Sequence, residues 1–296
     1  MPCKRAAPPL DLDCRTPEWD WFRADDAGKI DEVDRSVQNF RGRRHLHCLD
    51  LLSATAIMAT TWASFQYLSK SCDFRDTMSN YDVTSRDGFF ETLELALSVV
   101  EYGFAIAGPP CSMFVFLSSG AHKRTAAQPS GDQSHKKVRL ANLVASNALS
   151  IMKIMAARSV FVMIEQPLNS LMYHYEPFAT WVAGNPSLFF VVTYMQAFGH
   201  DMVKPTKLLT NMKSARLLTR QRPARKLEAS SSCESGDGQP GRKYLRMCPS
   251  GPSGDRDLQS SASYTQDFAQ AVFFAWEHEF RRGDHMATLY PVDVEE

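Results

Sequence analysis

The chain has 296 residues, of which 44% are hydrophobic, so it can bury one large core. Its 33 Lys and Arg balance 33 Asp and Glu, which excludes the strongly basic composition typical of many nucleic-acid-binding proteins, although a local basic cluster is still compatible with one. Seven cysteines lie without a CxxC pair and the N-terminus lacks an apolar signal segment, so we expect free thiols, no structural zinc and an intracellular, nuclear or cytoplasmic protein. No membrane span is expected, because apolar runs such as Leu188 to Met195 are far shorter than about 18 to 20 residues.

From His45 onward, short apolar runs alternate with amphipathic stretches, whereas residues 1–44 mix Pro, Asp and Arg and are interpreted as a flexible N-terminal extension. This alternation is typical of βα units around a parallel sheet. Strands buried on both faces of such a sheet are continuously apolar. Five runs are therefore predicted as strands: Leu46 to Leu51, a weaker one at Phe65 to Cys72, Phe104 to Ala107, Val160 to Ile164 and Leu188 to Tyr194.

Apolar residues recur at helical spacing over 89–100, 141–155 and 266–280, and each stretch is predicted as a helix. Residues 221–262 are rich in Ser, Gly, Pro and Arg, so we expect a polar linker or a disordered insert there. The sequence thus predicts one α/β domain at 45–220 with a doubly wound, mostly parallel sheet. A C-terminal helix at 263–282 docks onto it, and a tail follows at 283–296.

The segment Phe104-Ala-Ile-Ala-Gly-Pro-Pro-Cys111 runs from a predicted buried strand into a turn that ends in a thiol. In an open α/β sheet, ligands bind outside the carboxyl ends of the strands, which is where this turn places Cys111. Two prolines fix the backbone before the thiol, as a positioned nucleophile requires. A buried, inert cysteine is the alternative.

A second predicted strand, Val160-Phe-Val-Met-Ile-Glu165, ends in a carboxylate and is followed by Gln166 and Pro167. Burying a carboxylate is costly unless it has a partner or a chemical role. Burial also raises the pKa of a carboxyl group, which suits an acid that protonates a ring nitrogen. Glu165 could instead cap a helix, and Gln166 could be a turn residue.

The order of these features resembles the cytosine-5 DNA methyltransferases, over about 45–211. In that family a nucleophile motif is followed by a polar, flexible loop and a long helix. A predicted strand ends in Asp50, Gly108-Pro-Pro-Cys111 resembles the nucleophile motif, and Ser118 to Lys136 takes the place of the loop. Glu165-Gln-Pro resembles the strand end that reads Glu-Asn-Val in the family. Phe198-Gly199 and Lys204-Pro205-Thr206-Lys207 fall where the family has Tyr-Gly and Pro-Gln-x-Arg.

This resemblance implies a Rossmann-like methyltransferase fold and a specific chemistry. Cys111 would attack carbon 6 of a cytosine flipped out of nucleic acid, with DNA favoured, while Glu165 hydrogen-bonds and protonates ring nitrogen 3. Carbon 5 would then take a methyl group from S-adenosylmethionine. The resemblance further implies cofactor contacts at Asp50, Leu51, Ser53, Asp73, Asp82 and Pro109, and substrate contacts at Ser112, Gln166, Lys204 and Lys207.

The cofactor turn departs from the family pattern Asp-Leu-Phe-x-Gly-x-Gly-Gly, because its glycine positions carry Ala54, Ala56 and Ile57. A Cβ penalises the left-handed conformations and close approaches that glycine permits, so the sequence predicts weakened S-adenosylmethionine binding. A second hypothesis follows: a catalytically inactive relative that binds nucleic acid or a protein partner.

A third hypothesis, a thiol hydrolase, requires His122, His135 or His174 beside Cys111. Phosphate contacts would explain two basic clusters, although ordinary solvated charge explains them equally well. Because 221–262 stands where the family inserts its target recognition domain, base-specific recognition is not expected. One cluster holds eight Lys or Arg and no acids between 202 and 227, and the other consists of Lys123, Arg124, Lys136, Lys137 and Arg139.

Overall fold

The computed structural model describes residues 45–52, 54–73, 81–116, 119–222 and 263–282, and the backbone of two short strands between 245 and 254. All of these residues belong to one unit of the chain, Arg43–Glu296. The predicted extension at 1–44, the tail at 283–296 and most of the linker at 221–262 lie outside the described residues.

Six strands form one mixed sheet in the order β2-β1-β3-β4-β6-β5. β1 pairs in parallel with β2 and β3, and β3 pairs in parallel with β4. β6 runs antiparallel to both β4 and β5, so the other five strands share one direction. The predicted α/β class is confirmed, and β6 makes the sheet mixed. The strands are β1 (Leu46–Leu51), β2 (Ser69–Cys72), β3 (Val99–Ala107), β4 (Phe161–Pro167), β5 (Phe189–Tyr194) and β6 (Pro205–Thr210).

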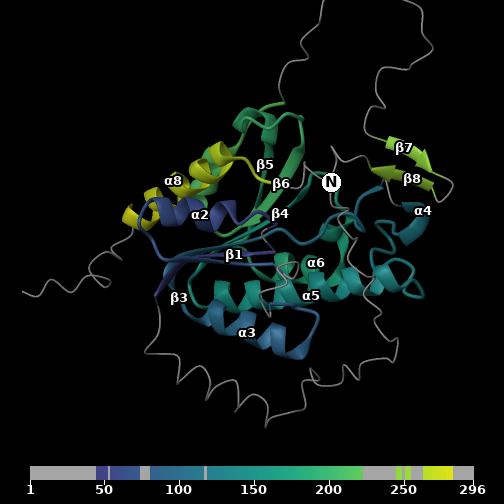
Figure 1. Ribbon diagram of the computed structural model, residues 1–296, viewed down its shortest axis with the longest axis horizontal. Helices are drawn as coiled ribbons and strands as arrows, with labels where there is room; N and C mark the ends of the chain where they lie inside the picture. Colours follow the sequence, from purple (N-terminus) through teal and green to yellow (C-terminus); the bar gives the residue numbers. More distant parts are fainter. Residues whose placement is uncertain are drawn as a thin grey trace, which may run out of the picture. The chain divides into compact units, whose positions relative to one another are not determined.

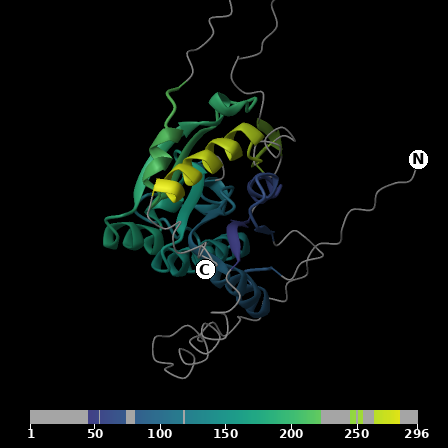
Figure 2. The same cartoon turned by 90° about the vertical axis from the view of Figure 1, so that its left-hand side faces the viewer.

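Helices cover both faces of the sheet (Figure 1). α2 and α8 pack together on one face, whereas α3, α5 and α6 lie on the other. Figure 2 shows α8 lying across the sheet on the side turned toward the viewer. The helices are α2 (Ile57–Ser64), α3 (Arg86–Leu97), α4 (Ser119–His122), α5 (Lys136–Ala157), α6 (Glu176–Gly184) and α8 (Gln266–Arg282), with 3-10 turns η3 (Leu171–His174), η4 (Met195–Phe198) and η5 (Lys213–Leu218).

The five predicted strands are all present, and β1 has the predicted bounds. The helix predicted over 89–100 is shorter at its end, because α3 stops at Leu97 and Val100 belongs to β3. Two successive β-branched residues, Val99 and Val100, favour a strand, and Val99 pairs with Leu46 of β1. The predicted helices at 141–155 and 266–280 are confirmed within α5 and α8.

Two strand regions were not predicted. β6 begins with a proline and buries two threonines, Thr206 and Thr210, so its composition resembles that of a loop although its backbone pairs on both sides. A separate hairpin of β7 (Leu245–Cys248) and β8 (Gly251–Gly254) lies within the segment expected to lack structure. Backbone pairing in a hairpin needs no large apolar side chain, so composition alone did not predict it.

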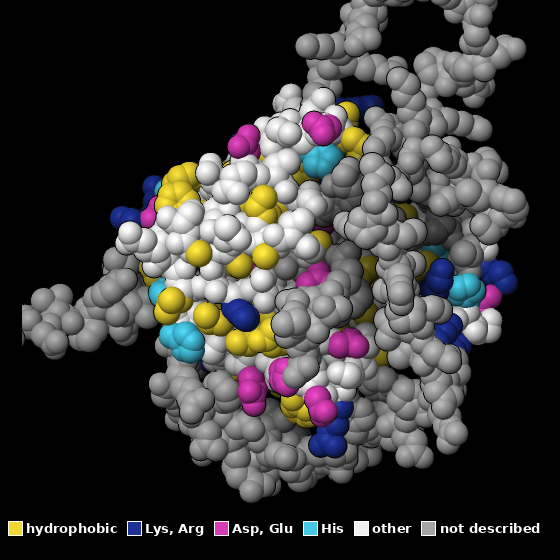
Figure 3. Space-filling model, viewed as in Figure 1, with side chains coloured by type: hydrophobic (Ala, Val, Ile, Leu, Met, Phe, Trp, Pro, Cys, Tyr) yellow, Lys and Arg dark blue, Asp and Glu magenta, His cyan; other side chains and the backbone are white. Residues whose placement is uncertain are grey.

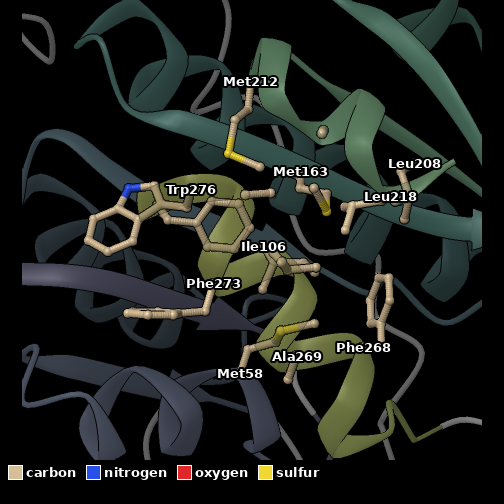
Figure 4. Close-up of a cluster of buried hydrophobic side chains, with 14 of the residues drawn as sticks. Met58, Ile106, Met163, Leu208, Met212, Leu218, Phe268, Ala269, Phe273 and Trp276 are labelled. Atoms are coloured by element: carbon tan, nitrogen blue, oxygen red, sulfur yellow. The ribbon is translucent and has the colours of Figure 1, made fainter. Parts of the chain in front are cut away.

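A cluster of buried apolar side chains fills the space between the sheet and the pair α2 and α8 (Figure 4). Trp62 of α2 stacks on Phe104 of β3 with ring centroids 4.9 Å apart, and the ring of Trp276 in α8 lies 5.6 Å from that of Trp62. The indole N–H of Trp276 donates to the carbonyl oxygen of Tyr102 at 2.9 Å. The C-terminal helix is therefore part of the core.

α5 is, among the described residues, the one helix long and apolar enough to cross a membrane. Ten of its 22 residues are buried in this fold, and a helix that packs in a protein core has the same composition. Its length and composition therefore do not distinguish a membrane span from a core helix.

Replacing Trp276 with alanine should lower the free energy of unfolding by about 3 to 5 kcal/mol, because a buried ring and its hydrogen bond are lost. Phe274 of the same helix is 53% exposed and provides the control, since Phe274→Ala should cost far less. Urea denaturation of the three proteins measures both values. Equal losses for the two variants would contradict the packing of α8 described here.

Candidate functional site

Three neighbouring strands, β1, β3 and β4, bring their carboxyl ends to one edge of the sheet. Asp50 pairs with Ile106, and Ile106 pairs with Met163. Glu165 lies two residues beyond Met163, and side chains two residues apart on a strand share a face. Because Ile106 and Met163 belong to the apolar cluster against α2 and α8, the carboxyl groups of Asp50 and Glu165 face that side as well.

The Cys111 thiol lies directly after β3, close enough to Glu165 for their charges to interact. Burial of the thiol, and then the negative charge of Glu165, raise the pKa of Cys111 to about 11, against an opposing effect of the Lys204 ammonium group. The structure therefore brings together the two side chains predicted to be catalytic. At neutral pH the sulfur carries its proton.

Glu165 is a buried carboxyl group with a cation beside it. Its side chain is 10% exposed, and its Oε1 lies 3.7 Å from Nζ of Lys204, which is an ion-pair distance and too long for a hydrogen bond. Oε1 has no hydrogen-bond partner within the part of the chain that the structure describes. Burial raises the pKa of Glu165, and Lys204 opposes that rise. Burial thus makes Glu165 keep its proton to a higher pH than an exposed glutamate would.

Gln166 holds the proline turn through its side-chain amide. Its side chain is fully buried, its Nε2 donates to the carbonyl oxygen of Pro109 at 2.6 Å, and its Oε1 accepts from Ser170 Oγ at 2.9 Å. These bonds give Gln166 a positioning role, and its substrate contact stays a prediction. The predicted cofactor residue Pro109 is buried at this contact.

The remaining predicted substrate residues are divided between the two faces of the sheet. Ser112 is exposed next to Cys111, and Lys204 lies beside Glu165. Lys207 pairs with Gln166 and not with Glu165, so it belongs to the opposite face. There its Nζ lies 4.9 Å from the ring centroid of Tyr173, which separates it from the predicted site.

The loop after Cys111, predicted to be flexible, is organised around the buried guanidinium group of Arg124. Arg124 donates from Nε to the carbonyl oxygen of Met113 at 2.7 Å and from Nη1 to Oδ1 of Asn142 in α5 at 2.8 Å. It also lies 3.9 Å from the ring centroid of Phe114. Arg124 is 3% exposed and its donors serve the loop, so this member of the basic cluster does not present its guanidinium group to solvent.

Replacing Arg124 with methionine should open the segment that follows Cys111, because several backbone carbonyl groups lose their buried donor. Limited chymotrypsin digestion should then cut after Phe114 much faster, while Lys123→Met should leave the rate unchanged. Lys123 is the matched control because its ion pair with Asp132 is exposed on the lysine side. Equal cleavage rates in the two variants would disprove the organising role of Arg124.

The cofactor turn keeps glycine-like backbone conformations although it lacks glycine. Leu52, Ala54 and Ala56 have φ values of 58°, 51° and 55°, in the left-handed region that a Cβ disfavours. Ile57 begins α2, and its side chain packs against the apolar cluster, so the Cβ at this position points into the core. Three residues occupy the positions where the family pattern has glycine. The backbone is strained at two of them, Ala54 and Ala56, and not at Ile57.

Asp50, at the end of β1, directs a buried carboxyl group toward the start of α2. Its Oδ2 accepts from the amide of Ala59 at 3.3 Å, while Oδ1 finds no hydrogen-bond partner among the described residues. Burial raises the pKa of Asp50 to about 7, although the Ala59 amide opposes this. An unsatisfied buried acceptor at this position can take a donor from a bound ligand.

The other predicted cofactor residues differ in their surroundings. Asp73 accepts from the amide of Ala54 at 2.7 Å, and it is close enough to Asp50 to raise that residue's pKa further. Asp82 accepts from the amide and hydroxyl of Thr84 at 2.8 and 2.6 Å, which forms a turn before α3. Leu51 is buried, and Ser53 lies outside the described residues.

His122 is not arranged to activate Cys111. Its Nε2 lies 2.9 Å from the carbonyl oxygen of Val115, and its Nδ1 accepts from the amide of Arg124 at 2.9 Å. Both ring nitrogens therefore serve the loop. Across the described ranges, no group of three or more His, Cys, Asp or Glu side chains could hold a metal ion.

Sequence reasoning missed Tyr264, which directly precedes α8. Its side chain is buried, and burial together with the charges of Glu165, Asp50 and Cys111 raises the pKa of its hydroxyl well above the usual value. Tyr264 is therefore close enough to Glu165 and Cys111, the predicted catalytic pair, for their charges to affect it, although about 100 residues separate it from Glu165 in the sequence. No local pattern around Tyr264 signals this position.

No protein-family model matches the chain, and no curated protein matches it either.

The pKa of Cys111 predicts a steep pH dependence of its reactivity. Alkylation by iodoacetamide should be slow at pH 7 and should accelerate about tenfold per pH unit up to pH 10, because only the thiolate reacts. Glu165→Gln should move the Cys111 profile to lower pH, since it removes a negative charge that raises the pKa. Peptide mass spectrometry gives the rate at each cysteine. A plateau below pH 8 in the unmodified chain would contradict this electrostatic account.

Proposed function

We propose that this protein transfers a methyl group to carbon 5 of a cytosine in nucleic acid, with DNA as the favoured substrate. The observation that carries the proposal is the convergence of the Cys111 thiol and the Glu165 carboxyl group from neighbouring strand ends, with Lys204 beside them. A nucleophile and a buried acid on one side of a sheet edge are the two groups that addition to a pyrimidine ring requires.

In the proposed reaction, the Cys111 sulfur loses its proton and forms a bond to carbon 6 of the ring. Glu165 in its protonated form donates to ring nitrogen 3, so the electron pair displaced from the carbon 5–carbon 6 double bond is stabilised. Carbon 5 would then take the methyl group, with the demethylated thioether of the cofactor as the leaving group, and lose its proton to a water molecule. Carbon 6 then expels the Cys111 sulfur as the carbon 5–carbon 6 double bond reforms. The raised pKa of Glu165 supports its part in this sequence, because burial favours the protonated form that donates to the ring.

S-Adenosylmethionine, when bound, supplies an electrophilic methyl group. The fit of this chain to that cofactor rests on the unsatisfied Oδ1 of Asp50 and on the left-handed backbone at Ala54 and Ala56. Asp50 would accept from a donor of the cofactor, and Asp73 lies beside the turn, where it accepts from the amide of Ala54. The strain at the two alanines predicts weaker binding than a glycine turn would give.

A cationic side chain near the carboxyl edge of the sheet supports a nucleic-acid substrate. Arg220 lies 4.9 Å from the ring centroid of Phe198, which follows β5, whereas Arg216 lies 5.0 Å from that of Phe189, at the opposite end of β5. Guanidinium groups ordered on aromatic rings can contact phosphate with little further loss of entropy. On the face drawn in Figure 3, lysine and arginine side chains stand in several separate places, which agrees with weak, sequence-independent contacts.

A second function, binding of nucleic acid without catalysis, is favoured by one observation. With a pKa of about 11, Cys111 is almost entirely protonated at neutral pH. Only about one sulfur in 10⁴ would then be reactive at pH 7. If ligand binding does not lower this pKa, the same scaffold serves as a binding module.

Covalent trapping on DNA that contains 5-fluorocytosine tests the proposed reaction. With S-adenosylmethionine present, fluorine at carbon 5 blocks the final proton loss, so the bond to Cys111 persists and gives a shifted band in a denaturing gel. Cys111→Ser should abolish that band, and Glu165→Gln should reduce the trapping rate by about 10² or more. Cys72→Ser, which alters a buried thiol of β2, is the control and should trap normally.

Calorimetric titration with S-adenosylmethionine separates the two functions. Binding together with trapping supports the methyltransferase, whereas DNA binding without either result supports the non-catalytic module. Trapping that survives Cys111→Ser would eliminate the proposed mechanism.

A further inference from the structure

The Tyr264 hydroxyl lies beside Gly108, just after β3, which is the strand between β1 and β4. Its phenol is buried, and the charges that act on its hydroxyl come from Glu165 of β4, Asp50 of β1 and Cys111 after β3, in that order, with Tyr173 last. One oxygen atom therefore lies within electrostatic reach of the predicted nucleophile, the predicted acid and the predicted cofactor carboxyl group. The proposed function assigns it no role.

Gly108 has no Cβ, and this leaves room for the Tyr264 hydroxyl beside the strand ends. Gly108 follows β3, which lies between β1 and β4 in the sheet. A Cβ added to this glycine would lie 2.9 Å from the Tyr264 hydroxyl oxygen, a separation that real Cβ atoms do not show. The next protein atom, the carbonyl oxygen of Leu52, would be 3.6 Å away, which is ordinary contact. Only glycine at this position admits the hydroxyl.

The phenol is held in place by the start of α8. Thr265 donates from Oγ1 to the carbonyl oxygen of Phe198 at 2.6 Å and accepts from the amide of Phe268 at 3.2 Å. Gln266 donates to the hydroxyl of Thr61 in α2 at 3.1 Å. The ring of Tyr264 packs 5.5 Å from that of Phe268, and Nζ of Lys204 lies 5.7 Å from its centroid. These contacts fix the direction of the hydroxyl.

We propose that Tyr264 is a substrate-positioning residue, whose neutral O–H donates a hydrogen bond to the pyrimidine that Cys111 and Glu165 act on. This inference rests on the proposed function and makes α8 a part of the site. A neutral donor in a buried position stabilises negative charge that develops on a ring under attack, without competing for the proton of Glu165. Burial, and then the carboxyl groups around the phenol, keep it protonated, which is the state that this role needs.

Tyr264→Phe tests the role because it removes one oxygen and keeps the ring. We expect the rate of trapping on 5-fluorocytosine DNA to fall about tenfold to hundredfold. The melting temperature should change by no more than about 2 to 4 °C. Tyr175→Phe is the matched control, since it removes a hydroxyl that lies 3.0 Å from Ser146 Oγ, in α5 on the other face of the sheet. That variant should trap at the rate of the unmodified chain.

A double-variant cycle tests the contact itself, independently of catalysis. Gly108→Ala should lower the melting temperature because its Cβ meets the Tyr264 hydroxyl, and adding Tyr264→Phe should restore most of that loss. A harmless Gly108→Ala, or a loss that Tyr264→Phe does not restore, would overturn the placement of the hydroxyl.

The outcomes distinguish this proposal from the function on which it rests. If the unmodified chain traps and Tyr264→Phe traps equally well or faster, the positioning role is wrong while the proposed function stands. If the unmodified chain fails to trap at any pH up to 10, the proposed function fails and the positioning role fails with it.

Discussion

The pairing register of β1, β3 and β4 decides which side chains can meet in this protein. Asp50, Ile106 and Met163 pair with one another across the three strands. The residues that follow each of them in the chain therefore lie together at the carboxyl ends of the strands. Two carboxyl groups and a thiol-bearing turn share that edge. A shift of one residue in β4 would turn Glu165 toward the opposite face, where Gln166 now lies, and separate it from Cys111.

Burial and charge act against each other throughout the cluster. Removing Asp50, Cys111 and Glu165 from water disfavours their charged forms and raises all three pKa values. Lys204 is the cation that opposes this effect at Cys111 and Glu165, from a distance of 3.7 Å to the carboxylate. Each of the three groups therefore keeps its proton to a higher pH than it would on a surface, which suits proton transfer and makes the thiol slow to react without a ligand.

Side chains that touch no reacting group still determine where the nucleophile stands. Gln166 fixes the carbonyl group of Pro109, and Arg124 fixes that of Met113, so both sides of Cys111 are tied to buried donors. The segment just before α8 contributes Tyr264, which belongs to the same buried apolar cluster as Trp276 of that helix. Site geometry and core stability are thus coupled, because the helix that completes the cluster is also a large part of the core.

The sequence by itself determined the α/β class, five of the strands and the long helices, because continuous apolar runs and helical spacing record burial locally. It also indicated that Cys111 follows one strand and that Glu165 lies at the end of another. This was enough to predict that the two side chains lie close together. Only the tertiary structure decided the roles of Gln166 and Arg124, the side on which Lys207 lies, and the presence of β6 and Tyr264 at the site. Those features depend on register and on contacts between residues far apart in the chain, and neither leaves a pattern in neighbouring residues.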